Sequence, residues 1–585
     1  MRLLYIWIND YKCFNNAELN FSDGIRFNYN KQTHQLCREE TESENDLFSL
    51  LPCYSNVDNI SIIVGSNGSG KTSICELLFE IFYLGNSNID HILIYEQDGE
   101  RYIHKNENTI CINQSGIELT NYFHINNFNF IYYSPFYSSM HVMQTLGSPD
   151  NSTFHDISTS ALLKNDKIYY ENQRSNVSYV NTISNLDANT ISDFKRTIDF
   201  LIKAINNNHN FKLGVSFPQT FFFKVDNNDR KAFENEFQNE NDIFTIYQDI
   251  VTKIENTHEN KVICNILLAL FCNFGRSTLN RSHSGLNHEV AFEYISRIQN
   301  AYSQDEQSVY SIFRTLFQSL NSSENISGLL VQLPNTRTQA MINFFNFLIN
   351  LDSTFFVNDG ISFNIPDNKT ELIEFHKLYK LTQQLTEYGT FEPQPYLSSG
   401  EYSEILLYSR LYEICNTIIE RDENKNIILF LDEVEITLHP KLQQGIIQNL
   451  LYFTEEFFPE SSLHLQIIFA THSPIILSDV PSPNVIFLYK EPGQFKSKIE
   501  SSKTLKTFGS NIYTLYQDSF FITNMPIGDF AREQINKAIK DVNSKYETQV
   551  NVSPLTKYIV SQIGEPILKN MIESRMNNND SISTE

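Results

Sequence analysis

The chain has 585 residues, 41% of them hydrophobic, and a formal net charge of −25. This much apolar material supports a sizeable core and excludes an intrinsically disordered protein, and the length leaves room for about three or four domain-sized units. Because a uniformly acidic surface repels phosphate groups, direct binding of DNA would need a local basic groove or a partner that supplies one.

The cysteines and the hydropathy restrict the class of protein further. The eight cysteines are scattered, and none belongs to a pair of CxxC motifs at zinc-binding spacing. Scattered thiols are typical of a reducing compartment. The first residues lack the apolar run of a signal peptide, and no stretch reaches the roughly 18 uninterrupted apolar residues of a membrane span. We therefore expect a cytoplasmic protein that does not cross a membrane.

The first region with recognisable chemistry comprises residues 1–145. Short runs of β-branched and aromatic residues bounded by turns predict strands, and apolar residues at helical spacing predict a helix. The strands are expected at Leu3–Ile8, Ala17–Phe21 and Asn59–Val64, and the helix at Ser73–Tyr83. The polar residues 24–58 are interpreted as a loop or a small insertion.

A glycine-rich loop connects the last of these strands to the helix. Its sequence, GSNGSGKT over residues 65–72, fits the phosphate-binding pattern G-x-x-x-x-G-K-[ST]. Glycines let several backbone N–H groups point at one phosphate cluster, and the helix that follows adds the positive end of its dipole. The residues expected to contact ATP are Gly65, Asn67, Gly68, Ser69, Gly70, Lys71, Thr72 and Ser73. Lys71 would reach the β- and γ-phosphates and Thr72 would ligate magnesium, whereas the alternative is a glycine-rich turn that matches by chance.

A second region, residues 390–525, contains a carboxylate pair. The apolar run Ile427–Leu431 predicts a buried parallel strand, and it is closed by Asp432 and Glu433. Ligands of open α/β sheets bind at such strand ends. We expect Asp432 to hold magnesium and Glu433 to orient or deprotonate the attacking water. The alternative, a strand that simply meets solvent at acidic residues, loses weight because the same chain carries a phosphate loop.

Residues 146–389 carry no recognisable motif. Helices are predicted at Ile191–Ile205 and Asp242–Glu255, and a strand at Thr220–Val225. No sustained heptad pattern and no internal repeat is present in the sequence. Residues 526–585 are interpreted as a helical tail whose polar end is expected to be disordered.

Two further segments resemble those of ABC-type ATPases. Leu397–Glu401, LSSGE, is similar to the ABC signature, and Ile468–Pro474, IFATHSP, is similar to the segment with the switch histidine. The order of the motifs also resembles the family. The resemblance implies an α/β P-loop NTPase of the ABC-ATPase type, with ATP and magnesium as ligands. Its head would be assembled from residues 1–145 and 390–525, around a largely helical insertion at 146–389 that could bind a partner or act as a sensor, with a tail at 526–585.

The same resemblance implies roles for individual residues. Ser398, Ser399, Gly400 and Glu401 would face the γ-phosphate that a second head holds, although Ser399 stands where glycine is more usual and an ordinary helix cap is the alternative. His472 would contact the γ-phosphate and act with Glu433 in catalysis, whereas a lone histidine beside a strand is more often a satisfied polar residue. His439 would lie in the D-loop at the interface of two heads. The glutamine that senses magnesium in the family is missing from Phe130–Pro135, and Gln144 lies ten residues later.

The first strands, with Ile8–Phe14, and the segments Thr507–Ile512 and Asp518–Phe521 resemble SMC-like and OLD-like ATPases. The combination is similar to AAA-family ATPases of bacterial anti-phage defence, including the Septu, retron-linked and restriction-associated ones. Residues 475–585 contain neither the acidic signature of a TOPRIM nuclease nor an HNH-like cluster. We therefore expect a head-to-head dimer or higher homo-oligomer that controls a separate effector such as a nuclease, with direct DNA binding left open. The alternatives are an SMC-like DNA repair or chromosome-maintenance ATPase and an ATP-bound scaffold with little turnover.

Overall fold

The computed structural model divides the chain into two compact units, residues 1–509 and 510–585, which are described separately. Its description covers all residues except 1, 23–24, 40–46, 48–55, 85–88, 98, 106–112, 115–119, 122–127, 137–152, 173–183, 207–216, 227, 238–240, 257–258, 280–307, 322–334, 383–387, 422–424, 460–462, 491–493, 501–505, 520–528, 549–551 and 581–585.

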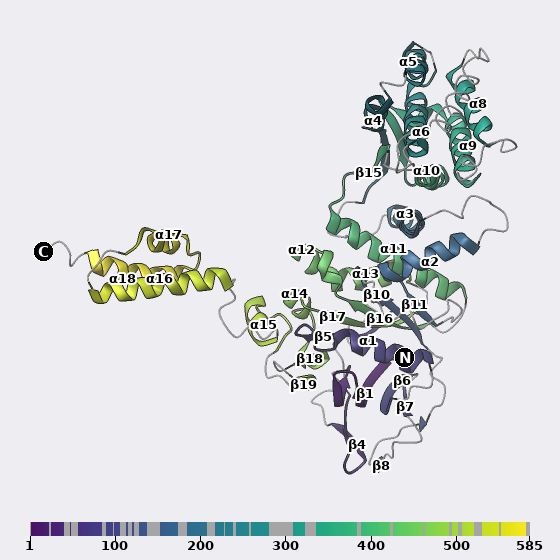
Figure 1. Ribbon diagram of the computed structural model, residues 1–585. Helices are drawn as coiled ribbons and strands as arrows, with labels where there is room; N and C mark the ends of the chain where they lie inside the picture. The colour runs from purple at the N-terminus through teal and green to yellow at the C-terminus, as the bar shows by residue number, and fades with distance from the viewer. Residues whose placement is uncertain are drawn as a thin grey trace. The chain divides into compact units, whose positions relative to one another are not determined.

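A seven-stranded sheet organises the first unit (Figure 1). Its strands, in spatial order, are β11 (Phe154–Asp156), β10 (Asn129–Tyr133), β16 (Asn426–Asp432), β17 (His464–Thr471), β5 (Val57–Gly65), β18 (Val485–Tyr489) and β19 (Lys498–Glu500). All neighbours are parallel except β18 and β19. The central strands are continuous apolar runs because both faces of the sheet are covered. The predicted strand Asn59–Val64 lies within β5, and the predicted buried strand at 427–431 lies within β16.

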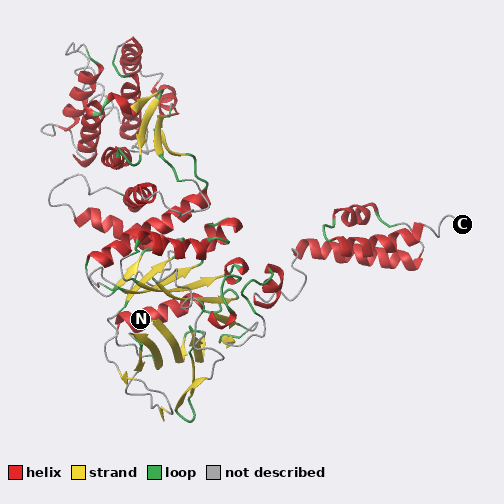
Figure 2. Ribbon diagram, turned by 180° about the vertical axis from the view of Figure 1, so that it is seen from behind, coloured by secondary structure: helices red, strands yellow, loops and turns green. Residues whose placement is uncertain are grey.

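Helix α1 (Lys71–Leu84) lies between this sheet and a second, mostly antiparallel one (Figure 2). The second sheet has the order β2 (Phe14–Asn20), β1 (Arg2–Tyr11), β6 (His91–Gln97), β7 (Glu100–Lys105) and β9 (Thr120–Asn121). Ile74, Leu77 and Leu78 of α1 are fully buried in the core that joins the two sheets. The predicted helix Ser73–Tyr83 is thus confirmed as part of α1, and its apolar side chains fill the space between the sheets.

The region interpreted as a loop or small insertion contains a hairpin. Strands β3 (Arg26–Asn30) and β4 (Gln35–Glu39) pair antiparallel, and β4 also pairs with β8 (Asn113–Gln114). Phe27 and Tyr29 alternate with polar residues and are buried against Tyr5 and Trp7 of β1. The loop interpretation is therefore wrong for residues 26–39, because Phe27 and Tyr29 of β3 with Leu36 of β4 suffice to bury one face of a small sheet.

Helices cover the other face of the seven-stranded sheet. They include α2 (Thr159–Asn172), α3 (Asn185–Asn206), α11 (Ser399–Glu420) and α13 (Ile446–Phe457), and the predicted helix Ile191–Ile205 lies within α3. The ring centroids of Phe200 and Phe457 are 5.2 Å apart, as are those of Tyr408 and Phe453. Contacts between aromatic rings thus join α3, α11 and α13, and they connect the start of the middle region to the helix that begins in the LSSGE segment.

The rest of the middle region combines helices with a four-stranded antiparallel sheet. The strands are β13 (Phe356–Val357), β14 (Gly360–Asn364), β12 (Thr220–Val225) and β15 (Gly389–Gln394). The helices are α4 (Asn228–Phe237), α5 (Asn241–Asn256), α6 (Lys261–Leu279), α8 (Val309–Asn321), α9 (Asn335–Asn350), η6 (Ser353–Phe355) and α10 (Lys369–Thr382). The predicted strand at 220–225 and the predicted helix at 242–255 are confirmed as β12 and as part of α5. The proposed boundaries at 145 and 389 fall inside the first unit and stay predictions.

Short helices complete the first unit: η7 (Val434–Thr437), α12 (Pro440–Gln443), α14 (Pro474–Leu477) and η8 (Ser482–Asn484). The second unit is helical, with α15 (Ile512–Ser519), α16 (Asp529–Thr548), α17 (Pro554–Gln562) and α18 (Pro566–Asp580). Ala538, Val542 and Val560 lie in its small apolar core. None of the helices in the described parts of the chain has both the length and the apolar character needed to cross a bilayer.

Candidate nucleotide-binding site

Three parallel strands end side by side at one edge of the seven-stranded sheet. In the register of β16 and β17, Asp432 is opposite Ala470, and in that of β17 and β5, Thr471 is opposite Val64. The phosphate loop, the carboxylate pair and the switch histidine therefore begin at the same edge, although 360 residues separate Thr72 from Asp432 in sequence. This is the edge at which open α/β sheets bind ligands.

The phosphate loop has the backbone conformation that its glycines permit. Gly68 and Gly70 have φ values of 72° and 101°, in the region that favours glycine. A Cβ atom on Gly70 would lie 2.4 Å from Sγ of Cys13, so a larger residue would displace the β1–β2 turn. The Nζ of Lys71 donates to the carbonyl oxygen of Gly65 at 3.2 Å. Burial lowers the pKa of Lys71, while the carboxylates of Glu433 and Asp432 favour its charged form.

A cavity of about 600 Å³ opens above this loop. It is lined by Lys12, Cys13, Asn67, Gly68, Gly70, Lys71, Thr72, Ser73, Glu433, His472, Lys490 and Phe495. The structure thus brings most of the predicted loop residues together with Glu433 and His472. Gly65 is the last residue of β5, and the side chain of Ser69 within the loop is fully buried.

Asp432 has the surroundings of a buried metal-binding carboxylate. Its Oδ2 accepts hydrogen bonds from the hydroxyls of Thr72 at 3.2 Å and Tyr132 at 3.0 Å. Its Oδ1 is buried and accepts no hydrogen bond from any described residue. Burial raises the pKa of Asp432 to about 6, against the effect of the two hydroxyl donors. A hydroxyl and a carboxylate with one unused oxygen fit magnesium, which prefers oxygen ligands.

Glu433 and His472 face each other across the cavity. Glu433 has a φ of 52°, a left-handed conformation that is uncommon for a residue with a side chain and that turns it away from the direction of β16. The Nε2 of His472 lies 3.6 Å from Oε1 of Glu433. Burial and the charge of Lys71 lower the pKa of His472, so the neutral imidazole is favoured. A carboxylate and a neutral imidazole at this distance can both hydrogen-bond to one water molecule.

Two residues that sequence reasoning missed connect the carboxylate loop to the switch-histidine segment. Oε1 of Glu435 accepts from the backbone N–H of His472 at 2.6 Å. Gln443 accepts from the hydroxyl of Ser473 at 2.7 Å and donates to the carbonyl oxygen of Leu438 at 2.9 Å. Only the third carboxylate in the sequence DEVE could have indicated Glu435, and no local pattern indicates Gln443.

The predicted signature residues lie outside this cavity. Ser398 caps α11 and forms a reciprocal capping box with Glu401, and both Ser398 and Ser399 are exposed. A Cβ atom on Gly400 would lie 3.2 Å from the carbonyl oxygen of Thr437, so the start of α11 packs closely against the η7 turn. His439 caps α12 through its Nδ1, which accepts from the N–H of Lys441 at 3.2 Å.

The region where the glutamine was expected includes strand β10, and Tyr132 of this strand contacts Asp432. The neighbouring Asn129 and Tyr133 begin and end the strand. Gln144 lies outside the described residues. At the position where the resemblance implies a glutamine amide, a tyrosine hydroxyl contacts the carboxylate of Asp432.

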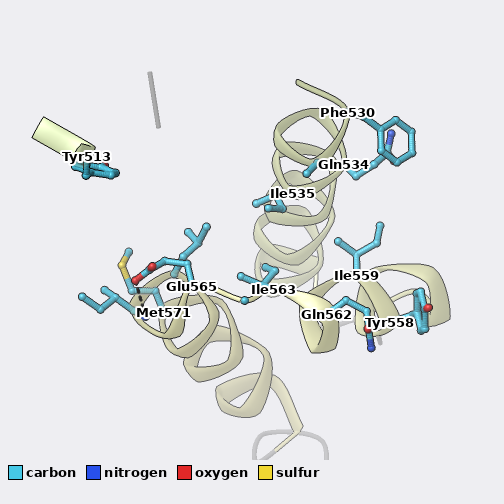
Figure 3. Close-up of a pocket in the computed structure, with 14 residues that line it drawn as sticks. Tyr513, Phe530, Gln534, Ile535, Tyr558, Ile559, Gln562, Ile563, Glu565 and Met571 are labelled. Carbon is cyan, nitrogen blue, oxygen red and sulfur yellow. Dashed lines mark hydrogen bonds between the residues drawn. The ribbon is translucent and has the colours of Figure 1, made fainter. Parts of the chain in front are cut away.

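A larger cavity, of about 800 Å³, lies in the second unit (Figure 3). Phe530 and Ile535 of α16, Tyr558 and Ile559 of α17, and Met571 of α18 line it. Its lining is mostly apolar and includes no lysine or arginine. This groove therefore lacks the cationic groups that bind a triphosphate, and the smaller cavity of the first unit is the better nucleotide site.

Two comparisons relate the chain to known proteins. The Retron Vc95 probable ATPase of Vibrio cholerae serotype O1 biovar El Tor is 36% identical over 118 residues, which cover 20% of this chain and 21% of that relative. The alignment thus spans about a fifth of either protein. The family model of the AAA ATPase domain matches residues 1–477. This range is most of the chain and includes the phosphate loop, the carboxylate pair and the histidine. The chain belongs to the AAA ATPase domain family.

Proposed function

We propose that the chain is an ATP-hydrolysing subunit of the ABC type, which closes head-to-head on ATP and acts as a nucleotide-gated clamp. The observation that carries this proposal is the division of the predicted phosphate contacts. Lys71, Glu433 and His472 line one cavity, whereas Ser398 and Ser399 are exposed at the start of α11 and are not among its lining residues. The exposed serines are available to a second head.

Within one head, each side chain has a distinct task. Lys71 binds the β- and γ-phosphates, and the N–H groups of the loop and of the start of α1 add partial positive charge. Thr72 and Asp432 would hold magnesium, which neutralises charge on the phosphate oxygens when it is bound. Glu433 accepts a proton from the attacking water or orients it, and His472 contacts the γ-phosphate.

The second head would supply α11. This helix has 22 residues, so its N-terminus offers a full helix dipole together with the hydroxyls of Ser398 and Ser399. In the capping box the hydroxyl oxygen of Ser398 accepts from the N–H of Glu401 and the carboxylate of Glu401 accepts from the N–H of Ser398, so the hydroxyl of Ser399 takes no part in it. His439, on the adjacent η7–α12 segment, would lie at the same interface.

The biological role is proposed from the relative. A retron-linked probable ATPase is similar over part of the sequence, and this supports a role in a bacterial anti-phage defence complex in the cytoplasm. The clamp would control a separate effector, such as a nuclease, while direct DNA binding stays open. An SMC-like role is less favoured because, within the described parts, the longest helices are α3 and α11 with 22 residues each, too short for a long coiled coil.

The experiment that tests the clamp is the mass of the Glu433→Gln variant, measured by light scattering with and without magnesium and ATP. The variant keeps the phosphate site and stalls hydrolysis, so the closed state should accumulate and the mass should double, or a pre-formed assembly should compact. Lys71→Ala in the same background is the matched control and should show no ATP effect. Introducing Ser399→Arg in that background should keep ATP binding and block closure. If ATP binds but mass and shape stay unchanged, the clamp is refuted and the chain is better regarded as an ATP-bound scaffold.

A further inference from the structure

A large aromatic side chain stands exposed at the rim of the phosphate cavity. Phe495 has a relative exposure of 85%, and it lines the same cavity as Lys71 and Thr72. Exposing a phenylalanine ring to water is unfavourable, by an amount that scales with the exposed apolar area. None of the roles proposed above for phosphate binding or hydrolysis uses this ring.

The sheet explains why the ring lies beside the phosphate loop. Strand β18 is parallel to β5, and Leu488 is opposite Gly65, so the residues that follow β18 emerge next to the loop. Lys490 is the first of them, and its Nζ lies 3.5 Å from the carbonyl oxygen of Gly68. The chain then returns along β19, which pairs with β18.

The returning segment is attached to the β1–β2 turn, which also lines the cavity. The backbone N–H of Ser497 donates to the carbonyl oxygen of Cys13 at 2.8 Å, and Lys496 forms an ion pair with Asp10. Cys13 belongs to the β1–β2 turn, which itself lines the cavity. Lys490 before Phe495 contacts the phosphate loop, and Lys496 and Ser497 after it contact the β1–β2 region, so Phe495 is placed beside both.

The ring also has a defined electrostatic partner. The Nζ of Lys490 lies 5.6 Å from the centroid of Phe495, within the range of a cation–π contact. A lysine and an aromatic ring at the rim of a triphosphate site match two parts of a nucleotide beyond its β-phosphate. The lysine matches the α-phosphate, and the ring matches the planar base. Every nucleobase has a π-face, so any base can stack on an aromatic side chain.

We propose that Phe495, positioned by Lys490, forms the base subsite of the nucleotide site and stacks on the nucleobase, with a preference for the larger purine ring. This inference rests on the proposed binding of a nucleoside triphosphate in the same cavity. It assigns a binding function to the β18–β19 segment, which no motif in the sequence indicates. It also explains why an exposed phenylalanine is held beside the phosphate loop.

The test compares two ligands that differ in the base. Binding of magnesium ATP and of magnesium tripolyphosphate, which has no base or ribose, is measured by calorimetry on the full chain. Phe495→Ala should weaken ATP binding roughly tenfold or more, in line with the usual effect of removing a stacking ring, and leave tripolyphosphate binding unchanged. Phe495→Tyr should retain ATP binding, and the parent chain should bind ATP and GTP more tightly than CTP and UTP.

Two controls separate stacking from general damage. Phe508 is also exposed, at 59%, and belongs to the same unit but does not line the cavity, so Phe508→Ala should affect neither ligand. A Phe495→Trp variant reports stacking directly, because the chain has one tryptophan, Trp7, and it is buried. ATP should change the emission of Phe495→Trp and leave that of the parent chain unchanged.

The outcomes distinguish this proposal from the proposed function. Equal weakening of both ligands by Phe495→Ala, or no weakening of either, would overturn the base subsite while the triphosphate site stands. If the parent chain binds neither ligand although Lys71 is intact, the nucleotide site itself fails, and the base subsite fails with it.

Discussion

The hydroxyl of Tyr132 donates a hydrogen bond to Oδ2 of Asp432 at 3.0 Å, across 300 residues of sequence. Both side chains are buried, and the same oxygen also accepts from Thr72. Two hydroxyl donors thus hold one oxygen of the carboxylate and leave Oδ1 without a hydrogen bond from the described residues. This arrangement fixes the direction in which the carboxylate can contact a magnesium-bound water.

Removing the tyrosine hydroxyl should weaken magnesium binding. In Tyr132→Phe, Asp432 keeps only Thr72 as a donor, and the loss of a hydrogen bond to a charged group typically amounts to about 1.5–3 kcal/mol. We expect the magnesium concentration at half-maximal ATPase rate to rise roughly tenfold. Direct titration with manganese, followed by electron paramagnetic resonance, measures the same change without turnover.

Tyr5 provides the matched control for this substitution. It is buried in β1 of the second, mostly antiparallel sheet. Its hydroxyl donates to Oε2 of Glu18 in β2 at 3.0 Å. Tyr5→Phe should leave the magnesium dependence unchanged. If Tyr132→Phe also leaves it unchanged, the hydroxyl has no part in magnesium binding.

A buried ion pair joins the middle region to α11. The guanidinium of Arg410 in α11 contacts Asp193 in α3 at 2.6 and 3.1 Å, and both residues are almost fully buried. Asp193→Asn would leave Arg410 in the interior without this carboxylate, which typically costs about 3–5 kcal/mol. The free energy of unfolding from denaturant titration measures the loss.

The double variant Asp193→Leu/Arg410→Met separates charge from packing. Because apolar residues of similar size often replace a buried pair at little cost, it should be more stable than Asp193→Asn alone. Glu374→Gln, in the more exposed pair with Lys377, should have little effect. If Asp193→Asn unfolds at the same denaturant concentration as the parent chain, the pair does not hold the two helices together.

Glu404 should make stability depend on pH. It is buried in α11, accepts from Nδ2 of Asn449 at 3.0 Å, and burial raises its pKa from 4.5 to about 7. Below pH 4.5 the carboxyl is protonated in both the folded and the unfolded chain. Between about 4.5 and 7 the unfolded chain loses this proton while the folded chain keeps it, so the free energy of unfolding falls as pH rises, by up to about 3 kcal/mol in total.

The isosteric variant Glu404→Gln tests this dependence. It has no proton to lose, so it should be more stable than the parent chain at pH 7.5, and the difference should shrink toward pH 5. Denaturation midpoints across this range give the comparison. A constant difference between the two proteins would show that Glu404 titrates normally.

Gln443 should affect turnover more than binding. Its amide joins the hydroxyl of Ser473, next to His472, to the carbonyl oxygen of Leu438. Gln443→Leu removes these two hydrogen bonds and a third, to the carbonyl oxygen of Glu435, and leaves the phosphate loop intact. The kcat should therefore fall roughly tenfold, as expected for about 1.4 kcal/mol of lost positioning, while the Kd for ATP changes little. A parallel loss of ATP affinity would indicate a general disturbance of the site instead.

Local patterns in the sequence predicted much of the first unit. The strand before Gly65, the helix after Lys71 and the apolar run before Asp432 are each encoded by a few contiguous residues, and the structure has β5, α1 and β16 there. The hairpin at residues 26–39 was missed because its buried face consists of a few aromatic residues in a polar stretch. No local pattern in this segment indicates that its aromatic side chains pack against β1.

The sequence by itself predicted the phosphate loop and the carboxylate pair. Both are encoded by residue type and immediate neighbours, namely the glycines, Lys71, Asp432 and Glu433. Only the tertiary structure decided which distant side chains join them. Tyr132 reaches Asp432, and Phe495 reaches the cavity, because parallel strands far apart in sequence end at the same sheet edge. Such contacts depend on strand order, and strand order is set by the packing of the whole sheet rather than by any local run of residues.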